Sequence, residues 1–121
     1  MAYKKQLGKI GEEIAVRYLK TKGYRIIQTN FRCRLGEIDI IGEDGEYIVF
    51  VEVKTRTSLL YGYPIESISN KKKNSIVKVA QTYISFKNLK NKDLRFDVVE
   101  IIVDNSNLDG KKQVRLIKNA F

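Results

Sequence analysis

The sequence predicts an α/β protein in which helices flank a mixed β-sheet, in the order α-β-β-β-α-β with one extra C-terminal strand. Three observations support this class. Apolar residues recur at helical spacing in two segments, they cluster or alternate at strand spacing in five others, and a strong hairpin signal joins two of the strands. A length of 121 residues with one proline fits a single domain, residues 1–121.

Helical spacing is clearest near the N-terminus and in the middle of the chain. Residues 7–22 are predicted as the first helix, with Gly23 placed to end it. Its apolar positions are Leu7, Ile10, Ile14 and Tyr18. Residues 69–87 are predicted as the second helix. Its expected core-facing residues are Ile76, Val79, Ala80, Tyr83 and Ile84.

Shorter segments are predicted as strands because they are rich in β-branched and aromatic residues and end at turn residues. These strands are residues 24–31, 36–42, 47–55, 94–103 and 113–117. Asp44-Gly45 is predicted as the two-residue turn between the second and third strands. A loop containing Gly62 and Pro64 follows the third strand, and a turn at residues 105–110 separates the last two.

The composition is strongly basic and lacks histidine. There are 23 Lys and Arg residues against 14 Asp and Glu, which gives a net charge of +9 at pH 7 and a pI of about 9.7. This charge favours partners that carry phosphates or an anionic surface. The absence of histidine excludes catalysis by a His-containing triad and zinc held by histidine. Acid–base or metal chemistry would therefore rely on carboxylates, lysine, tyrosine or the backbone.

The single cysteine and the apolar segments predict a cytoplasmic protein. Cys33 has no partner for an intramolecular disulfide and is interpreted as a structural thiol, which fits a reducing compartment. No secretion signal is recognised at the N-terminus, because charged residues interrupt the stretch that would have to be apolar. The apolar run at residues 47–51 is far too short to span a bilayer, so no membrane partner is expected.

Charged residues interrupt the third predicted strand. Side chains alternate along a strand, so Glu52 and Lys54 share one face with Ile48 and Phe50. Burying charged groups among such apolar neighbours is costly unless they pair with each other or bind a ligand. This face of the sheet is therefore a candidate for a functional site.

The hairpin brings a second carboxylate to that face. With Asp44-Gly45 as the turn, Asp39 lies opposite Phe50, and Asp39 and Glu52 become diagonal neighbours roughly 6–8 Å apart at Cβ. Two carboxylates at this distance repel each other unless a cation lies between them. Hard oxygen ligands suit Mg²⁺, which keeps several waters and takes one or two carboxylates plus phosphate oxygens of a substrate. Lys54 can position or deprotonate a water, or stabilise developing negative charge.

The first predicted helix supplies a further acid. On a helical wheel Glu12 lies in the stripe of Gly8, Ala15 and Leu19, beside the apolar face. The small residues Gly8, Gly11 and Ala15 would let this helix approach the sheet closely. Glu12 is therefore expected to reach the metal site, either directly or through a water.

A purely structural interpretation explains the same spacing. Glu52 and Lys54 would then form an ion pair on the face of the sheet, and Asp39 would pair with Arg34 or Arg56. Spacing alone leaves both interpretations open.

The whole constellation resembles a known nuclease pattern. Asp39 and Glu52-Val53-Lys54, preceded by a helix that bears Glu12, resemble the PD-(D/E)XK nuclease superfamily, whose core is the restriction-endonuclease-like fold. The chain is more closely similar to the YraN-like bacterial family, over roughly residues 7–102. The matching stretches are Gly8-x-x-Gly11-Glu12-x-x-Ala15, Gly23-Tyr24, Asn30-x-Arg32, Gly36-Glu37-Ile38-Asp39-Ile40-Ile41, Phe50-Val51-Glu52-Val53-Lys54-x-Arg56 and Arg95-Phe96-Asp97-Val98-Val99. Archaeal Holliday-junction resolvases are a related branch with the same arrangement.

The resemblance implies a role for each matching residue. Asp39 and Glu52 would ligate Mg²⁺ (or Mn²⁺), with the carbonyl of Val53 as a third ligand. Glu12 would complete the outer shell of the metal, and Lys54 would orient or activate the attacking water. The implied reaction is metal-assisted hydrolysis of phosphodiester bonds in nucleic acid, with DNA favoured over RNA and branched DNA included. A resolvase-like activity would also require a homodimer. The alternative is a non-catalytic nucleic-acid-binding module that keeps the nuclease fold.

Basic residues flank the predicted site. Arg32 and Arg34 precede the strand of Asp39, Arg56 follows Lys54, and Lys71, Lys72 and Lys73 open the second helix. They are candidates for contacts to nucleic-acid phosphates. For the lysines the alternative is a solvated helix face, and for Arg56 it is an ion pair with a carboxylate of the sheet.

Overall fold

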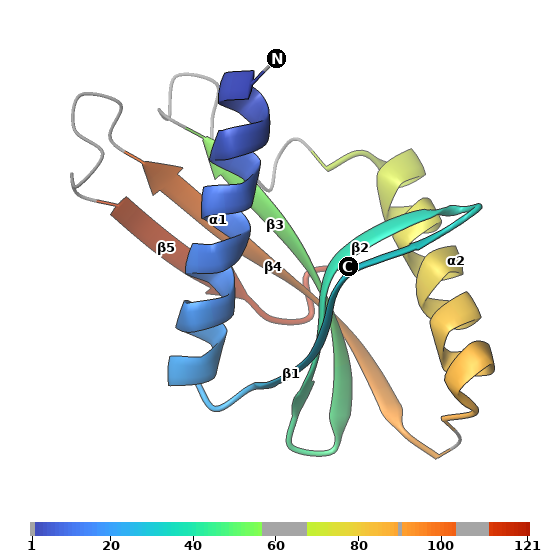
Figure 1. Ribbon diagram of the computed structural model, residues 1–121. Coiled ribbons are helices and arrows are strands. Elements are labelled where there is room, and N and C mark those ends of the chain that lie inside the picture. Colours follow the sequence, from blue (N-terminus) through green and yellow to red (C-terminus); the bar gives the residue numbers. More distant parts are fainter. Residues whose placement is uncertain (1, 57–67, 90, 104–111) are drawn as a thin grey trace.

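The order of helices and strands follows the prediction. The computed structural model describes residues 2–56, 68–89, 91–103 and 112–121 (Figure 1). Within them lie α1 (Ala2–Thr21), β1 (Arg25–Cys33), β2 (Gly36–Asp44), β3 (Tyr47–Arg56), α2 (Asn70–Lys87), β4 (Asp93–Val103) and β5 (Lys112–Ile117). The expected loop with Gly62 and Pro64 and the expected turn at residues 105–110 lie outside the described residues. Neither described helix is apolar over a stretch that would cross a bilayer.

The strands form one mixed sheet in the order β1-β2-β3-β4-β5. Neighbouring strands are antiparallel except β3 and β4, which are parallel and are joined through α2. Parallel neighbours need such a crossover, because the chain has to return to the same end of the sheet. In Figure 1, α1 lies across one face of the sheet and α2 lies against the other, beside the β1–β2 hairpin. This arrangement is compatible with a restriction-endonuclease-like fold.

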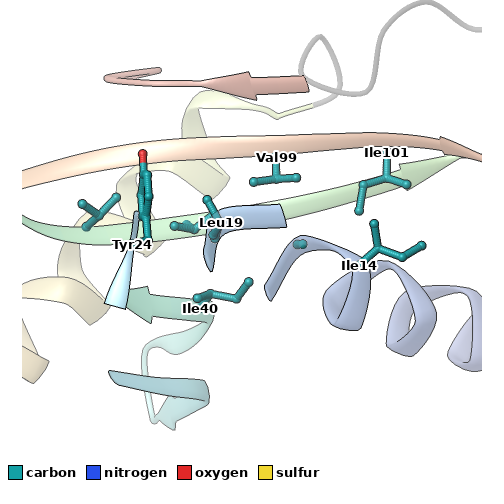
Figure 2. Packing of buried hydrophobic residues seen from close by; sticks show 9 residues of the cluster. Ile14, Leu19, Tyr24, Ile40, Val99 and Ile101 are labelled. Atoms are coloured by element: carbon teal, nitrogen blue, oxygen red, sulfur yellow. The ribbon is translucent and has the colours of Figure 1, made fainter. Parts of the chain in front are cut away.

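Each helix buries its own side of the sheet. The core under α1 combines residues of this helix with residues of β2, β3 and β4 and is shown in Figure 2. Its buried members are Ile14, Ala15, Leu19, Tyr24, Ile40, Val49, Val51, Val99 and Ile101. The core under α2 contains Ile38, Ile41, Ile48, Phe50, Ile76, Val79, Ala80 and Tyr83. Residues of β3 therefore alternate between the two cores, as the spacing predicts for a strand covered on both faces.

The rotation of α1 differs from the predicted one at Ile10, whose side chain is 42% exposed. The helix instead turns Gly11, Ile14 and Ala15 to the sheet, because Gly11 lies directly against Thr55 of β3. A side chain at Gly11 would overlap the hydroxyl of Thr55 and would place its Cβ 3.1 Å from the Cβ of Thr55. Gly11 thus sets how closely α1, with Glu12, approaches the strand.

Gly11→Ala is expected to destabilise the protein by about 1–3 kcal/mol, because overpacking forces the helix or Thr55 to move. Thermal unfolding followed by circular dichroism measures this change. The matched control is Gly8→Ala, since a Cβ at Gly8 meets nothing within 4 Å. That change should be neutral or stabilising by up to about 1 kcal/mol, because alanine favours a helix over glycine. Equal melting temperatures for Gly11→Ala and the unchanged protein would contradict the assigned contact.

The hairpin register differs from the prediction by two residues. The turn is Gly45-Glu46 rather than Asp44-Gly45, and Gly45 has the positive φ of 60° that a glycine-first hairpin turn uses. As a result Phe50 lies opposite Ile41, not opposite Asp39. Because side chains alternate with a period of two, a two-residue shift keeps residues on the same face of the paired part of the hairpin as predicted. The shifted register therefore still brings Asp39 and Glu52 near each other, and the charge of Glu52 acts on Asp39.

A buried polar cluster around Asp97 of β4 links the end of β2 to the C-terminal residues. Asp97 is fully buried and accepts hydrogen bonds from the hydroxyl of Tyr24 at 2.7 Å and from the guanidinium of Arg95 at 2.9 Å. Arg95 also binds Asp44 at 2.7 Å. The backbone N–H of Asn119 donates to Asp97 at 3.0 Å, so the cluster also fastens the C-terminal residues.

Candidate functional site

The strands β2 and β3 separate beyond the pair Ile40–Val51 and form a fork, which is visible in Figure 1. At the point of separation the carboxylate of Asp39 accepts a hydrogen bond from the backbone N–H of Val53, with Oδ2 2.8 Å from the nitrogen. In an unbroken ladder, a backbone carbonyl of β2 would have accepted the N–H of Val53. Here the side chain of Asp39 accepts it instead. The fork itself therefore fixes the position of Asp39.

The carbonyl of Val53 faces the same fork. In a strand, the N–H and the C=O of one residue point to the same neighbouring strand. Since the N–H of Val53 reaches Asp39 of β2, its carbonyl oxygen is directed to that side as well. Val53 can therefore supply a backbone oxygen beside the carboxylate, as the resemblance predicted.

Glu52 and Lys54 lie together on β3. Glu52 is only 6% exposed, and its Oε1 lies 3.6 Å from Nζ of Lys54. The ion pair of the structural interpretation is thus present. That interpretation also paired Asp39 with Arg34 or Arg56, but within the described ranges Asp39 binds the backbone of Val53 and no arginine. The structure holds Lys54 beside an acid that itself lies next to a second acid.

The two carboxylates at the fork repel each other. Burial, and next to it the charge of Glu52, raise the pKa of Asp39 to about 7, against the opposing effect of the Val53 N–H. The positive charge of Lys72, from the first turn of α2, acts in the opposite direction to Glu52. At neutral pH the fork therefore holds negative charge that its own residues compensate only in part.

Glu12 reaches the same site from α1. Burial, followed by the negative charge of Asp39, raises the pKa of Glu12, while a hydrogen bond from the side chain of Asn30 lowers it. Glu12, Val53 and Lys54 line one cavity of about 360 Å³. Glu12 also borders a neighbouring cavity of about 440 Å³ that includes Asn30. The expectation that the first helix would direct Glu12 to the strand carboxylates agrees with this placement.

The donors at the fork are the hard oxygen atoms of two carboxylates and a backbone carbonyl. Within the described part of the chain, no three acidic or thiol side chains are grouped tightly enough to hold a metal by themselves. A divalent cation would then be held by Asp39, Glu52 and the carbonyl of Val53, with waters filling the remaining positions. Such coordination is typical of Mg²⁺, which usually keeps several of its waters when it binds a protein. Glu12 would act on such an ion through a water.

The predicted basic residues lie in or next to β1, at the end of β3 and in the first turn of α2. Arg32 forms an ion pair with Glu37 across the β1–β2 hairpin, at 3.3 Å, and is largely exposed. Arg34 is exposed near the hairpin tip, and Arg56 is partly buried at the end of β3. Lys71, Lys72 and Lys73 occupy the first turn of α2.

The three lysines of this run have different surroundings. Lys71 is exposed, Lys72 acts electrostatically on Asp39, and Nζ of Lys73 lies 5.8 Å from the ring centre of Phe121. A uniformly solvated face therefore does not describe the run. Only Lys72 is tied to the fork directly.

Asn30 was not assigned a role from the sequence. It lies on β1 between the pairs Thr29–Ile40 and Phe31–Ile38, and its φ of 56° is left-handed, a conformation that asparagine tolerates better than most residues. Its side chain holds Glu12. The only signal in the sequence was its place in the matching stretch Asn30-x-Arg32, which spacing alone did not explain.

Comparison with known proteins identifies the family. The model of "Uncharacterised protein family UPF0102" matches residues 11–101. A UPF0102 protein of Clostridium botulinum strain Hall is 53% identical over 118 residues, covering 97% of this chain and 94% of that protein. A UPF0102 protein of Clostridium tetani is 52% identical over 120 residues, covering 99% and 97%. The resemblance to the YraN-like family is thereby confirmed.

Proposed function

The chain belongs to the protein family UPF0102, and we propose that it is a Mg²⁺-dependent endonuclease of the PD-(D/E)XK type that hydrolyses phosphodiester bonds in DNA. One observation carries the proposal. Asp39 and Glu52 meet at the fork between β2 and β3, where the carboxylates repel each other and Lys54 lies 3.6 Å from Glu52. Buried like charges of this kind are costly to a fold and are expected where a cation is to be bound.

The residues of the fork divide the work of hydrolysis. Bound Mg²⁺ would polarise the scissile phosphate and lower the pKa of a coordinated water. Asp39, Glu52 and the Val53 carbonyl would hold the ion and fix its position. Lys54, free to exchange Glu52 for substrate, would orient the attacking water or stabilise the charge that develops on the phosphoryl oxygens. Glu12, held by Asn30, would position a water of the ion.

The substrate follows from charge and from the family pattern. A net charge of +9 favours a polyanion, and the related resolvases make branched DNA the first substrate to examine. Cutting two strands at one branch would use two copies of the chain, so a homodimer is part of the proposal for such substrates. Sedimentation with and without four-way DNA measures that association.

A substrate screen tests the proposed function. Linear, flapped, nicked and four-way DNA and a structured RNA are incubated with Mg²⁺, Mn²⁺ or EDTA. We expect cutting of at least one DNA that EDTA abolishes and that Glu52→Gln lacks, while Glu13→Gln, an exposed acid next to Glu12 in sequence, cuts normally. Cutting that persists in EDTA, or in Glu52→Gln, would exclude the proposed mechanism. Salt-sensitive binding of all DNAs without any cutting would instead support the non-catalytic binding module.

A further inference from the structure

A groove that contains two lysines runs along the outer side of α2. It consists of two adjoining cavities of about 540 and 520 Å³ that share Leu35 and Lys78. From the helix it is lined by residues of one stripe, spaced three or four apart. These residues are Lys71, Asn74, Ser75, Lys78, Gln81, Thr82, Ser85 and, at the far end, Phe86. The opposite wall is Leu35, at the tip of the β1–β2 hairpin.

The hairpin tip is fixed to the helix, so the groove is a formed feature. The hydroxyl of Ser75 donates a hydrogen bond to the carbonyl of Leu35 at 2.9 Å. Gly36 follows with a φ of 147°, and a Cβ there would lie 2.9 Å from the hydroxyl oxygen of Ser75. Glycine therefore allows the tip to lie close to α2, and the two walls keep their spacing.

The groove is basic and has no acidic counterpart on its helix. The 18 residues of α2 include Lys71, Lys72, Lys73, Lys78 and Lys87 but no aspartate or glutamate. Among the described residues that line the two cavities there is no carboxylate either. The remaining lining is mostly amides and hydroxyls, which donate hydrogen bonds to phosphate oxygens without selecting a base.

Exposed apolar side chains are too few here for a protein interface. Leu35 is 51% exposed and Phe86 is 76% exposed, and lysine and hydroxyl side chains separate them along the groove. A protein partner would need a larger apolar centre, since charged residues are depleted from such centres and lysine is depleted from interfaces generally. A regularly charged polyanion matches the lysine stripe better.

The groove adjoins the strand that carries Asp39. Leu35, one of its walls, directly precedes β2, and Asp39 is the fourth residue of that strand. From Lys71 to Phe86 the helix rises about 22 Å. B-DNA rises about 3.4 Å per base pair along its axis, so a duplex whose axis lies parallel to α2 would extend about six base pairs over this length.

We propose that the groove between α2 and the β1–β2 tip binds the backbone of duplex DNA on one side of the scissile phosphate, over about six base pairs. The proposal rests on the proposed function for the identity of the ligand. Binding in the groove, however, needs neither metal nor chemistry. It can therefore be tested separately from cleavage.

Binding is measured by fluorescence anisotropy with a 20-base-pair duplex in EDTA, at several salt concentrations. The double change Lys71→Gln/Lys78→Gln should raise Kd roughly 10-fold and reduce the slope of log K against log salt by about 2, because each phosphate contact contributes about 0.9. The matched control is Lys20→Gln/Lys112→Gln, which removes two exposed lysines from α1 and β5. It should leave the slope almost unchanged. Equal Kd and slope for the two double changes would contradict the proposal that the groove binds DNA.

Shortening the duplex tests the length and the location together. With the branch or nick held constant, affinity should fall once one flank is shorter than about six base pairs. Lys71→Gln/Lys78→Gln should be insensitive to that shortening, because the contacts are already lost. If the double change and the shortened flank reduced affinity independently, the flank would lie elsewhere and the inference would be wrong.

The two proposals fail in different ways. If no DNA is cut but Lys71→Gln/Lys78→Gln still weakens binding, the groove stands and the endonuclease does not. If DNA is cut with Mg²⁺ but the double change leaves binding and flank dependence unaltered, the endonuclease stands and the groove does not.

Discussion

Asp39→Asn is expected to abolish metal-dependent cleavage and, at pH 8 without metal, to make the protein more stable than the unchanged chain. Cleavage should fall by about 1,000-fold or more, because a lost metal ligand removes several kcal/mol of transition-state stabilisation. The amide oxygen of asparagine can still accept the N–H of Val53, so the fork should keep its shape. A single change that raises stability and abolishes cleavage would show that Asp39 destabilises the fold and serves the reaction.

The expected gain in stability follows from the pKa of Asp39, which is raised to about 7 in the folded protein from an ordinary value of 3.8. A raised carboxyl pKa means that the folded state prefers the proton. The contribution of Asp39 to stability is therefore full below pH 3.8 and is lost as the pH rises through about 7. At pH 8 the charged side chain costs about 1–3 kcal/mol after allowance for its partial exposure, and asparagine avoids that cost.

Thermal unfolding in EDTA between pH 5 and pH 8 measures this difference. The gap between Asp39→Asn and the unchanged protein should widen as the pH rises, and added Mg²⁺ should narrow it by stabilising only the chain that keeps Asp39. The control is Asp93→Asn, which makes the same chemical change at an exposed position at the start of β4. A gap that is constant across pH would mean that Asp39 is not the titrating group.

Residue alternation explains why the sequence predicted the acidic site despite an incorrect turn. The error in placing Gly45 shifted the register by two residues, and a shift of two preserves the face of each side chain in the paired part of the hairpin. The predicted proximity of Asp39 and Glu52 therefore did not depend on the exact turn, and the charge of Glu52 does act on Asp39. A shift of one residue would have separated them.

The position of Glu12 beside the sheet could also be predicted, because the small residues Gly11 and Ala15 lie on the face of α1 that contacts the sheet. The role of Asn30 could not be predicted, because it depends on a left-handed backbone conformation in the middle of a strand. Periodicity assumes regular strands and cannot indicate where one is interrupted. The hydrogen bond to Glu12 arises only once α1 is packed beside that interruption.

The groove on α2 depends on tertiary contacts in the same way. The lysine run at residues 71–73 is evident in the sequence, but Lys73 turns out to lie over Phe121. Lys78, which lies about two turns beyond Lys71, instead lines the groove with it because the tip at Leu35 meets α2 there. Both lysines are evident in the sequence, but the position of the β1–β2 tip against α2 is not.

Asp97→Ala is expected to cost about 3–5 kcal/mol, which is a large part of the 5–15 kcal/mol that holds a typical domain folded. Asp97 is fully buried and is the shared acceptor for Arg95, the hydroxyl of Tyr24 and the backbone N–H of Asn119. Removing it leaves the partly buried guanidinium of Arg95 and two other donors without that carboxylate. Chemical denaturation with urea measures the loss.

Tyr24→Phe is the graded control, because it removes only the hydroxyl, which donates to Asp97 and accepts from Arg95, and keeps the ring in the core under α1. Losing these two hydrogen bonds should cost about 1–2 kcal/mol. In the described part of the chain Asp97 bonds to Tyr24, Arg95 and Asn119 and to no residue of the fork, so cleavage per folded molecule should be unaffected in both variants. If Asp97→Ala folded as stably as Tyr24→Phe yet lost activity, the cluster would serve the reaction, and its assignment as the fastening of the sheet to the C-terminal residues would be wrong.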